Sequence, residues 1–194
     1  MKAAAPWLGV AASVLFAAAL LGFGAALQGY SQAMHPVSVL GAKGVPHALG
    51  FNLLGFVLPG VLAAAAALDL RRRLPAGTGW SARIGVQLVL LSAVGFAALG
   101  LLSLDPADLH NDASSLHATA WMLWWVAFVP GAVLIAGGLR GHVGARALAG
   151  ASAVAALLVL VAALLAVELM PAGVAQRLGY AAWLGWLCVA GRMR

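Results

Sequence analysis

Six long apolar runs, with almost no charge inside them, divide the sequence. Each is long enough to cross about 30 Å of hydrocarbon as a helix of roughly 20 residues. The runs are continuously apolar and rich in Ala and Leu, whereas the strands of a membrane barrel alternate apolar and polar residues. The pattern therefore predicts an all-α bundle of six transmembrane helices that forms a single domain over residues 1–194. The expected helices cover about residues 7–27, 48–68, 84–104, 118–139, 147–167 and 174–190.

Composition and the placement of charge agree with a membrane protein. The chain is 64% hydrophobic and 8% charged, whereas a soluble domain carries about 25% charged residues. The net charge of +6 comes from basic residues that gather at one set of helix ends, as they do on the cytoplasmic side of membranes. We therefore expect both termini in the cytoplasm, a location in the cytoplasmic (inner) membrane of a bacterium, and no nucleic-acid partner. The residues at this set of ends are Lys2, Arg71, Arg72, Arg73, Arg83, Arg140, Arg146, Arg192 and Arg194, with only Lys43 and Arg177 opposite them.

The most polar segment, DPADLHNDASSLHATAW, leads from Asp105 into the fourth apolar run. Its first residues are typical of a helix start, with Asp105 as the cap and Pro106 at the first position. They predict a short helix over residues 106–110, and Ser114 or Ser115 is expected to cap the fourth long helix. The predicted topology places this segment on the extracytoplasmic side, together with most of the histidines and carboxylates.

Four side chains of the predicted outer side are candidate metal ligands: His47, His110, Asp112 and His117. Zinc takes three or four His or carboxylate ligands and lowers the pKa of a bound water to about 7. If the outer loops bring the four residues together, they could hold zinc in a hydrolase that acts on a lipid. The candidate catalytic groups that would orient the water are Ser38, Asp108 and Glu168.

Two of the apolar runs open with a similar pattern, HALGFNLLGFVLPGVL from His47 and HATAWMLWWVAFVPGAVL from His117. Each has an aromatic residue four positions after the histidine and Pro-Gly near its middle. The similarity indicates a bundle built from repeated helical hairpins, in which the prolines kink the helices and open an outward-facing polar pocket. The residues expected to line this pocket, and to bind a lipid or a small amphipathic molecule, are Trp121, Trp124, Trp125 and Asn52.

The chain resembles the bacterial and archaeal six-helix membrane proteins grouped as domain of unknown function 998. The resemblance rests on the six-span layout, on GYSQAMHPVSVLGAKGVP after the first run, on FNLLGFVLPG in the second, and on SLHATAW before the fourth. More distantly, the layout is similar to that of the eukaryotic DRAM-like six-helix proteins. The resemblance implies the six-helix architecture and no particular activity.

Three functions remain open from the sequence, and whether the protein is an enzyme is left undecided. The first is the metal-dependent lipid hydrolase. The second is a non-enzymatic lipid-binding, scaffold or transport protein. The third is a b-type haem protein with His47 and His117 as axial ligands. Membrane lipid is the expected partner, and the sequence predicts no oligomeric state. An ion pair between Glu168 and Arg177 is expected to fix the last hairpin.

Overall fold

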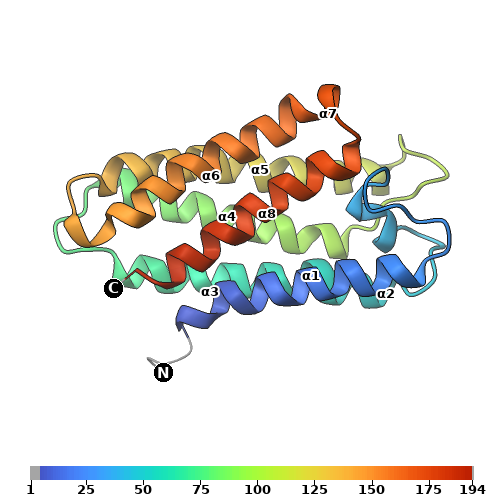
Figure 1. The fold of residues 1–194 in the computed structure, drawn as a ribbon, viewed down its shortest axis with the longest axis horizontal. Helices are drawn as coiled ribbons and strands as arrows, with labels where there is room; N and C mark the ends of the chain where they lie inside the picture. Colours follow the sequence, from blue (N-terminus) through green and yellow to red (C-terminus); the bar gives the residue numbers. More distant parts are fainter. Residues whose placement is uncertain (1–4, 194) are drawn as a thin grey trace.

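Long α-helices joined by loops make up the computed structural model, which describes residues 5–193 apart from the side chains of Ala5 and Val167 (Figure 1). Within this range the chain forms no strand. The long helices are α1 (Leu8–Ala26), α3 (Leu58–Arg73), α4 (Trp80–Leu101), α5 (Asp112–Leu139), α6 (Arg146–Leu164) and α8 (Ala172–Gly191). The short elements are η1 (Ala5–Trp7), η2 (Val37–Gly41), α2 (Ala48–Phe51), η3 (Asn52–Val57), η4 (Val143–Ala145) and α7 (Ala166–Leu169). The segments α2, η3 and α3 follow one another without a break, so they form one continuous helix.

The six helices pack as a closed ring in chain order. The continuous helix α2–α3 lies between α1 and α4, α5 lies between α4 and α6, and α6 contacts α8. The ring closes where α8 returns to α1, and Figure 1 shows α8 crossing the bundle obliquely between α1 and α6. Successive helices therefore run antiparallel, as in other helix bundles with short connections. The predicted all-helical bundle of six long helices is confirmed.

Five of the six helices are long and apolar enough to cross a membrane, including the continuous helix Ala48–Arg73. The sixth, α8, is not among the five, because Gln176, Arg177 and several glycines lower its mean hydropathy. The predicted start of the fourth helix at residue 118 is wrong, since α5 begins at Asp112. The third helix begins at Trp80 instead of residue 84.

An aromatic cluster around Phe96 fills the middle of the bundle. The Phe96 ring is fully buried. Its neighbours come from α1, η3, α5 and α8, and most of them meet it in tilted or edge-on arrangements, which aromatic pairs favour. The centroid distances from Phe96 are 5.8 Å to Phe16, 5.4 Å to Phe56, 6.3 Å to Trp124, 5.3 Å to Tyr180 and 4.5 Å to Trp183. The interior at this level is therefore packed with rings.

The second helix contains a π-helical stretch, η3, directly before Pro59. The N–H of Leu58 donates to the carbonyl of Leu53, five residues back, and Pro59 has no N–H with which to continue an α-helical ladder. Residues five apart share a face in a π-helix, whereas in an α-helix they lie about 140° apart. Phe51 and Phe56 are therefore both fully buried, with their ring centroids 5.3 Å apart.

The two helices predicted to be repeats differ in structure. His47 is exposed and has a left-handed backbone (φ 62°) just before α2. His117 is buried in the second turn of α5. The π-helix precedes Pro59, while Pro130 lies within an unbroken α5. The two histidines do not occupy equivalent positions, so the predicted hairpin repeat gains no support.

The two ends of the bundle differ in charge. The basic end carries the α3–α4 and α5–α6 loops and both ends of the described chain, where Gly191 lies against the carbonyl of Pro6 (Figure 1). The opposite end, called the loop end below, carries segments 27–47, 102–111 and 165–171. The arginines of the basic end are Arg71, Arg72, Arg73, Arg83, Arg140, Arg146 and Arg192.

Candidate functional site

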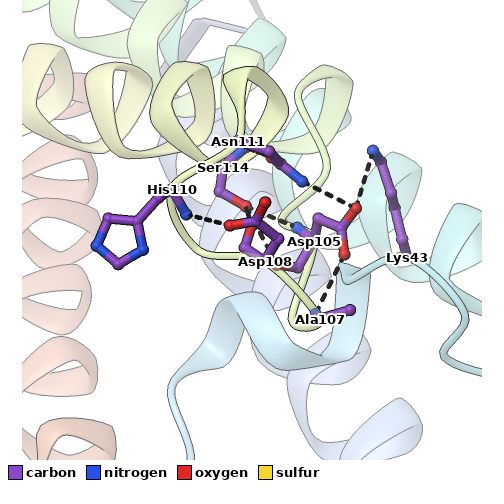
Figure 2. A network of polar contacts seen from close by, with 7 residues as sticks. All are labelled: Lys43, Asp105, Ala107, Asp108, His110, Asn111 and Ser114. Carbon is purple, nitrogen blue, oxygen red and sulfur yellow. Dashed lines mark hydrogen bonds and ion pairs between the residues drawn. The ribbon is translucent and has the colours of Figure 1, made fainter.

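The carboxylates of segment 102–111 bind the backbone of their own segment (Figure 2). Asp105 Oδ1 accepts a hydrogen bond from the N–H of Ala107 (3.1 Å), and Asp108 Oδ1 accepts one from the N–H of His110 (2.9 Å). Bonds from a carboxylate to an N–H two residues ahead favour turns over helix. The short helix predicted at residues 106–110 is therefore wrong, and two turns take its place.

Asn111 and Ser114 determine where α5 begins. Asn111 Oδ1 accepts from the N–H of Ser114 (2.9 Å) and caps the helix. The Ser114 hydroxyl lies inside the first turn and bonds to the carbonyls of Asp105 (3.1 Å) and Asp108 (2.9 Å). The Asn111 amide donates to Asp105 Oδ2 (3.1 Å), and Lys43 Nζ lies 3.4 Å from the same oxygen. The predicted caps Ser114 and Ser115 are replaced by Asn111, because an Asn side chain bonds the N–H three residues on.

The four candidate metal ligands lie in different surroundings. His47 and Asp112 are exposed, and Figure 2 shows the His110 ring pointing away from the polar network. His117 is 7% exposed, and its Nδ1–H donates to the carbonyl of Leu102, just past the end of α4 (2.7 Å). No group of three or more His, Cys, Asp or Glu side chains within residues 5–193 is placed to hold a metal ion. The expected convergence is not seen because the early start of α5 turns His117 into the bundle. This placement gives no support to a haem ligand pair either.

The three candidate catalytic groups are also apart from one another. Ser38 is buried in η2, and Glu168 is exposed on α7. Asp108 is exposed and holds its backbone turn. Among the described side chains, no hydrogen bond or ion pair joins any two of these three residues. The arrangement therefore offers no nucleophile beside a base.

The predicted aromatic pocket is filled by packing. Trp124 is 2% exposed, and its ring centroid lies 4.7 Å from that of Tyr180. Trp121 and Trp125 are partly buried. The cavity that Trp121 and Trp124 border has a volume of about 10 Å³, which is room for one water at most. Trp124 is thus a core residue, and the cavity beside it is too small for a lipid or another small molecule.

Asn52, the polar residue assigned to the same pocket, joins two loops instead. It is 4% exposed, and its amide donates to the carbonyl of Gly41 (3.0 Å) and to the hydroxyl of Ser103 (3.0 Å). A Cβ added at Gly41 would lie 1.9 Å from Asn52 Oδ1. Glycine is required at this position so that the loop can approach the helix closely.

The guanidinium of Arg177, early in α8, holds the first loop of the loop end. Nε and Nη2 donate to Gln32 Oε1 (3.1 and 2.7 Å), and Nη2 also donates to the Tyr30 hydroxyl (2.6 Å). Nη1 donates to the carbonyls of His35 (3.0 Å) and Gly173 (2.7 Å). All five donors of the guanidinium therefore meet neutral acceptors.

The predicted ion pair between Glu168 and Arg177 is wrong. Among the described residues no carboxylate contacts Arg177, because its guanidinium turns toward segment 29–37. Sequence reasoning missed this network. The available signal was the pair Gln176–Arg177, the polar interruption of an otherwise apolar run.

Two further glutamine contacts fix the same loop. Gln176 Oε1 accepts from the N–H of Val37 (2.6 Å), and the Gln32 amide donates to the carbonyl of Leu20 in α1 (3.0 Å). Because Gln32 Oε1 also accepts hydrogen bonds from Arg177, the loop is joined to both α1 and α8. These bonds close the loop end over the junction of the two helices.

Tyr30 and His35 stack inside this network, with ring centroids 5.6 Å apart. The N–H of Ser31 donates to His35 Nδ1 (2.9 Å), so the neutral imidazole carries its proton on Nε2. Burial raises the pKa of Tyr30, and the charge of Arg177 opposes this rise without cancelling it. The Tyr30 hydroxyl therefore stays protonated at neutral pH and donates to the carbonyl of Pro36 (3.3 Å).

An apolar groove runs along the outside of the bundle between α1 and α8. Its volume is about 410 Å³, and Arg177 lies at its limit toward the loop end. Ser13 and Cys188, whose Oγ and Sγ atoms are 3.4 Å apart, line it toward the basic end. Small residues between these limits, including Ala181 and Gly185, keep the groove open. A Cβ at Gly185 would meet no atom within 4 Å.

A family profile described as "Protein of unknown function (DUF998)" matches residues 10–193. The chain belongs to the DUF998 family. The match covers nearly the whole ring of helices and confirms the resemblance seen in the sequence. Comparison with curated proteins and with solved structures gives no match. The geometry of this DUF998 protein therefore carries the functional argument.

Replacing Arg177 with Met should release segment 29–37, because Met keeps an apolar stem and supplies no donor. Hydrogen bonds to a charged group contribute about 1.5–3 kcal/mol. We expect faster deuterium uptake in segment 29–37, measured by mass spectrometry, with unchanged uptake in α4 and α5. Arg146→Met, which removes an exposed arginine at the basic end, is the control and should leave the segment protected. Equal uptake in wild type and R177M would contradict the assigned role.

The turn at Asp105 should open at low pH. The N–H of Ala107, the Asn111 amide and Lys43 hold the pKa of Asp105 below its usual value of 3.8. Because the folded pKa is lowered, the stabilisation is present above the usual value and is lost as the pH falls through the folded pKa. Amide protection in segment 105–111, corrected for intrinsic exchange, should therefore fall with a midpoint below 3.8. In Asp105→Asn the protection of the Ala107 amide should be weak and independent of pH, because Asp108 holds only the following turn; a midpoint above 3.8 for Ala107 in the wild type would refute the assignment.

Proposed function

We propose that this DUF998 protein is an integral protein of a bacterial cytoplasmic membrane, with its basic end in the cytoplasm. Five helices of sufficient length and hydropathy support the membrane setting. The excess of arginine at one end supports the orientation, since basic loops stay on the cytoplasmic side. At the loop end the only basic residues are Lys43 and Arg177. Both termini then lie in the cytoplasm, and the loop end faces outward.

Cysteine labelling tests this orientation. After Cys188→Ala removes the only cysteine, a new cysteine replaces Ala76 in the α3–α4 loop or Ala107 in segment 102–111, both of which are exposed. A membrane-impermeant maleimide should label Ala107→Cys in intact spheroplasts and Ala76→Cys only after permeabilisation. The reverse pattern would overturn the orientation. Labelling of both in a soluble fraction would overturn the membrane setting.

Within this setting, we propose that the protein binds a membrane phospholipid and performs no chemistry on it. The observation that carries the proposal is the apolar groove between α1 and α8. From Arg177 to Cys188 it follows twelve residues of α8, whose eleven steps rise about 16.5 Å at 1.5 Å per residue. That is about half of a 30 Å hydrocarbon core. The groove is therefore about as long as one acyl chain.

The charge of Arg177 supports a lipid with a phosphate head group. Its guanidinium lies at the loop-end limit of the groove, where the head group of a lipid seated there would be. Among the described residues no carboxylate neutralises it, and its donors are already engaged with neutral oxygens. The attraction to an anionic group is therefore one of charge, without new hydrogen bonds from Arg177.

Lipid binding is preferred over hydrolysis on geometric grounds. The residues that could activate water face different surroundings, and His117 uses Nδ1 for a backbone carbonyl. Asp105 and Asp108 both hold turns. Nothing in the placement of these groups favours a reaction over simple binding.

A photoreactive phospholipid tests the groove. A diazirine in the acyl chain should cross-link mainly to peptides of α1 and α8. Gly185→Leu should fill the groove, since its side chain meets open space, and should reduce these cross-links several-fold. Leu also favours helix over Gly, so unfolding is not the expected cause. Gly22→Leu on α1, also exposed and also with open space at its Cβ, is the matched control. Cross-links spread evenly over all helices in the wild type would overturn the proposal.

A further inference from the structure

A second recess lies at the basic end, between the last turn of α3 and the first turns of α4. Its volume is about 500 Å³. Two arginines line it from the end of α3, and a third arginine, two large apolar residues and one glutamine line it from α4. The residues that matter are Arg71, Arg72, Trp80, Arg83, Ile84 and Gln87. This recess is on the opposite end of the molecule from Arg177.

The three arginines of the recess are not neutralised. Among the described residues no carboxylate forms an ion pair with Arg71, Arg72 or Arg83. The one acidic residue near the end of α3, Asp69, is 2.5 Å from Arg73 Nε. Arg73 turns inward and donates to the carbonyls of Ala190 (3.1 Å) and Met193. The charge left in the recess is therefore positive and without a partner.

The guanidinium donors of the recess are also largely free. Of the Arg83 donors, Nε alone bonds to the described part of the chain; it donates to the carbonyl of Thr78 (3.2 Å). Its Nη atoms, together with the guanidinium groups of Arg71 and Arg72, make no hydrogen bond within the described part of the chain. Two or three guanidinium groups around one space are the arrangement that binds phosphate oxygens in pairs.

The other side of the recess matches the body of a lipid. Trp80, Arg83, Ile84 and Gln87 follow the spacing i, i+3, i+4, i+7, so they share one face of α4. Trp80 is 80% exposed and Ile84 is 49% exposed, which is typical of residues at a membrane interface. Gln87 lies about 10 Å along the helix from Trp80. Its amide is exposed and makes no hydrogen bond in the described range, although a polar group facing lipid needs a partner.

We propose that this recess binds the head group of an anionic glycerophospholipid of the leaflet at the basic end. The phosphate lies among Arg71, Arg72 and Arg83, the Gln87 amide meets the glycerol ester region, and the chains continue along the apolar face of α4. The inference rests on the membrane setting proposed above but not on the α1–α8 groove. A free inorganic anion would use the arginines and would leave Gln87 and Trp80 without a role.

Native mass spectrometry of the full chain carrying Gly185→Leu, which fills the α1–α8 groove, tests the site after delipidation and mixing with phosphatidylglycerol or phosphatidylethanolamine. With the groove filled, this chain should retain phosphatidylglycerol preferentially, and it is the background for the variants that follow. Each arginine near the surface contributes enough attraction that Arg71→Gln with Arg83→Gln should lower phosphatidylglycerol occupancy about tenfold or more. Arg146→Gln with Arg192→Gln removes the same charge from exposed positions outside the recess and should lower it less than about twofold. Gln87→Leu should weaken binding of both lipids and leave the preference for phosphatidylglycerol intact.

Three outcomes would overturn the assignment. Equal losses in the two double variants would show diffuse attraction to the basic end. Displacement of phosphatidylglycerol by excess inorganic phosphate would show a free-anion site. Unchanged lipid binding by Gln87→Leu would show that the Gln87 amide does not contact the glycerol ester region. Gly185 does not line this recess. The Gly185→Leu variant should therefore still prefer phosphatidylglycerol, even if the groove proposal fails.

Discussion

The need to satisfy backbone carbonyls where apolar helices end governs how this protein uses its few polar side chains. In a chain with so little charge, each open carbonyl away from water requires a partner. His117 donates to the carbonyl of Leu102, just past the end of α4, and Arg177 donates to the carbonyl of His35 in the loop before α2. At the other end Arg73 does the same for Ala190 and Met193. These polar side chains therefore hold the loops and chain ends in place by hydrogen bonds to backbone carbonyls.

The sequence predicts the fold well because the constraint behind it is simple. A helix must bury about 20 apolar residues to cross a bilayer, so run lengths and basic loop ends indicate the helices and their order. The candidate site depended on finer detail. Asn111 starts α5 earlier than expected and turns His117 inward, and the left-handed turn at His47 leaves that ring exposed. Such capping and turn choices involve small energy differences between competing local partners, so composition and spacing do not decide them.

Because the interior of the helix ring is filled by side chains, space for a ligand is found on the outer surface of the ring. Phe96 and Trp124 occupy the space in which a central ligand would have to lie. The two hollows considered above instead open sideways, one under Arg177 and the other beside Arg83. The groove follows the middle of α8 from Arg177 to Cys188, whereas the recess lies at the basic end between α3 and α4. In the membrane setting proposed for this protein, a packed core with recesses on its outside suits ligands that arrive from within the bilayer.

The π-helical stretch η3 sets the orientation of the helix that follows it, α3. Both Phe51 and Phe56 reach the core only because the turn between them holds its bonds in a wider register. If the same number of residues between Phe51 and Pro59 wound as ordinary α-helix, everything beyond them would turn by about 100° around the axis. The π-helical hydrogen-bond register thus determines which side of α3 meets its neighbours.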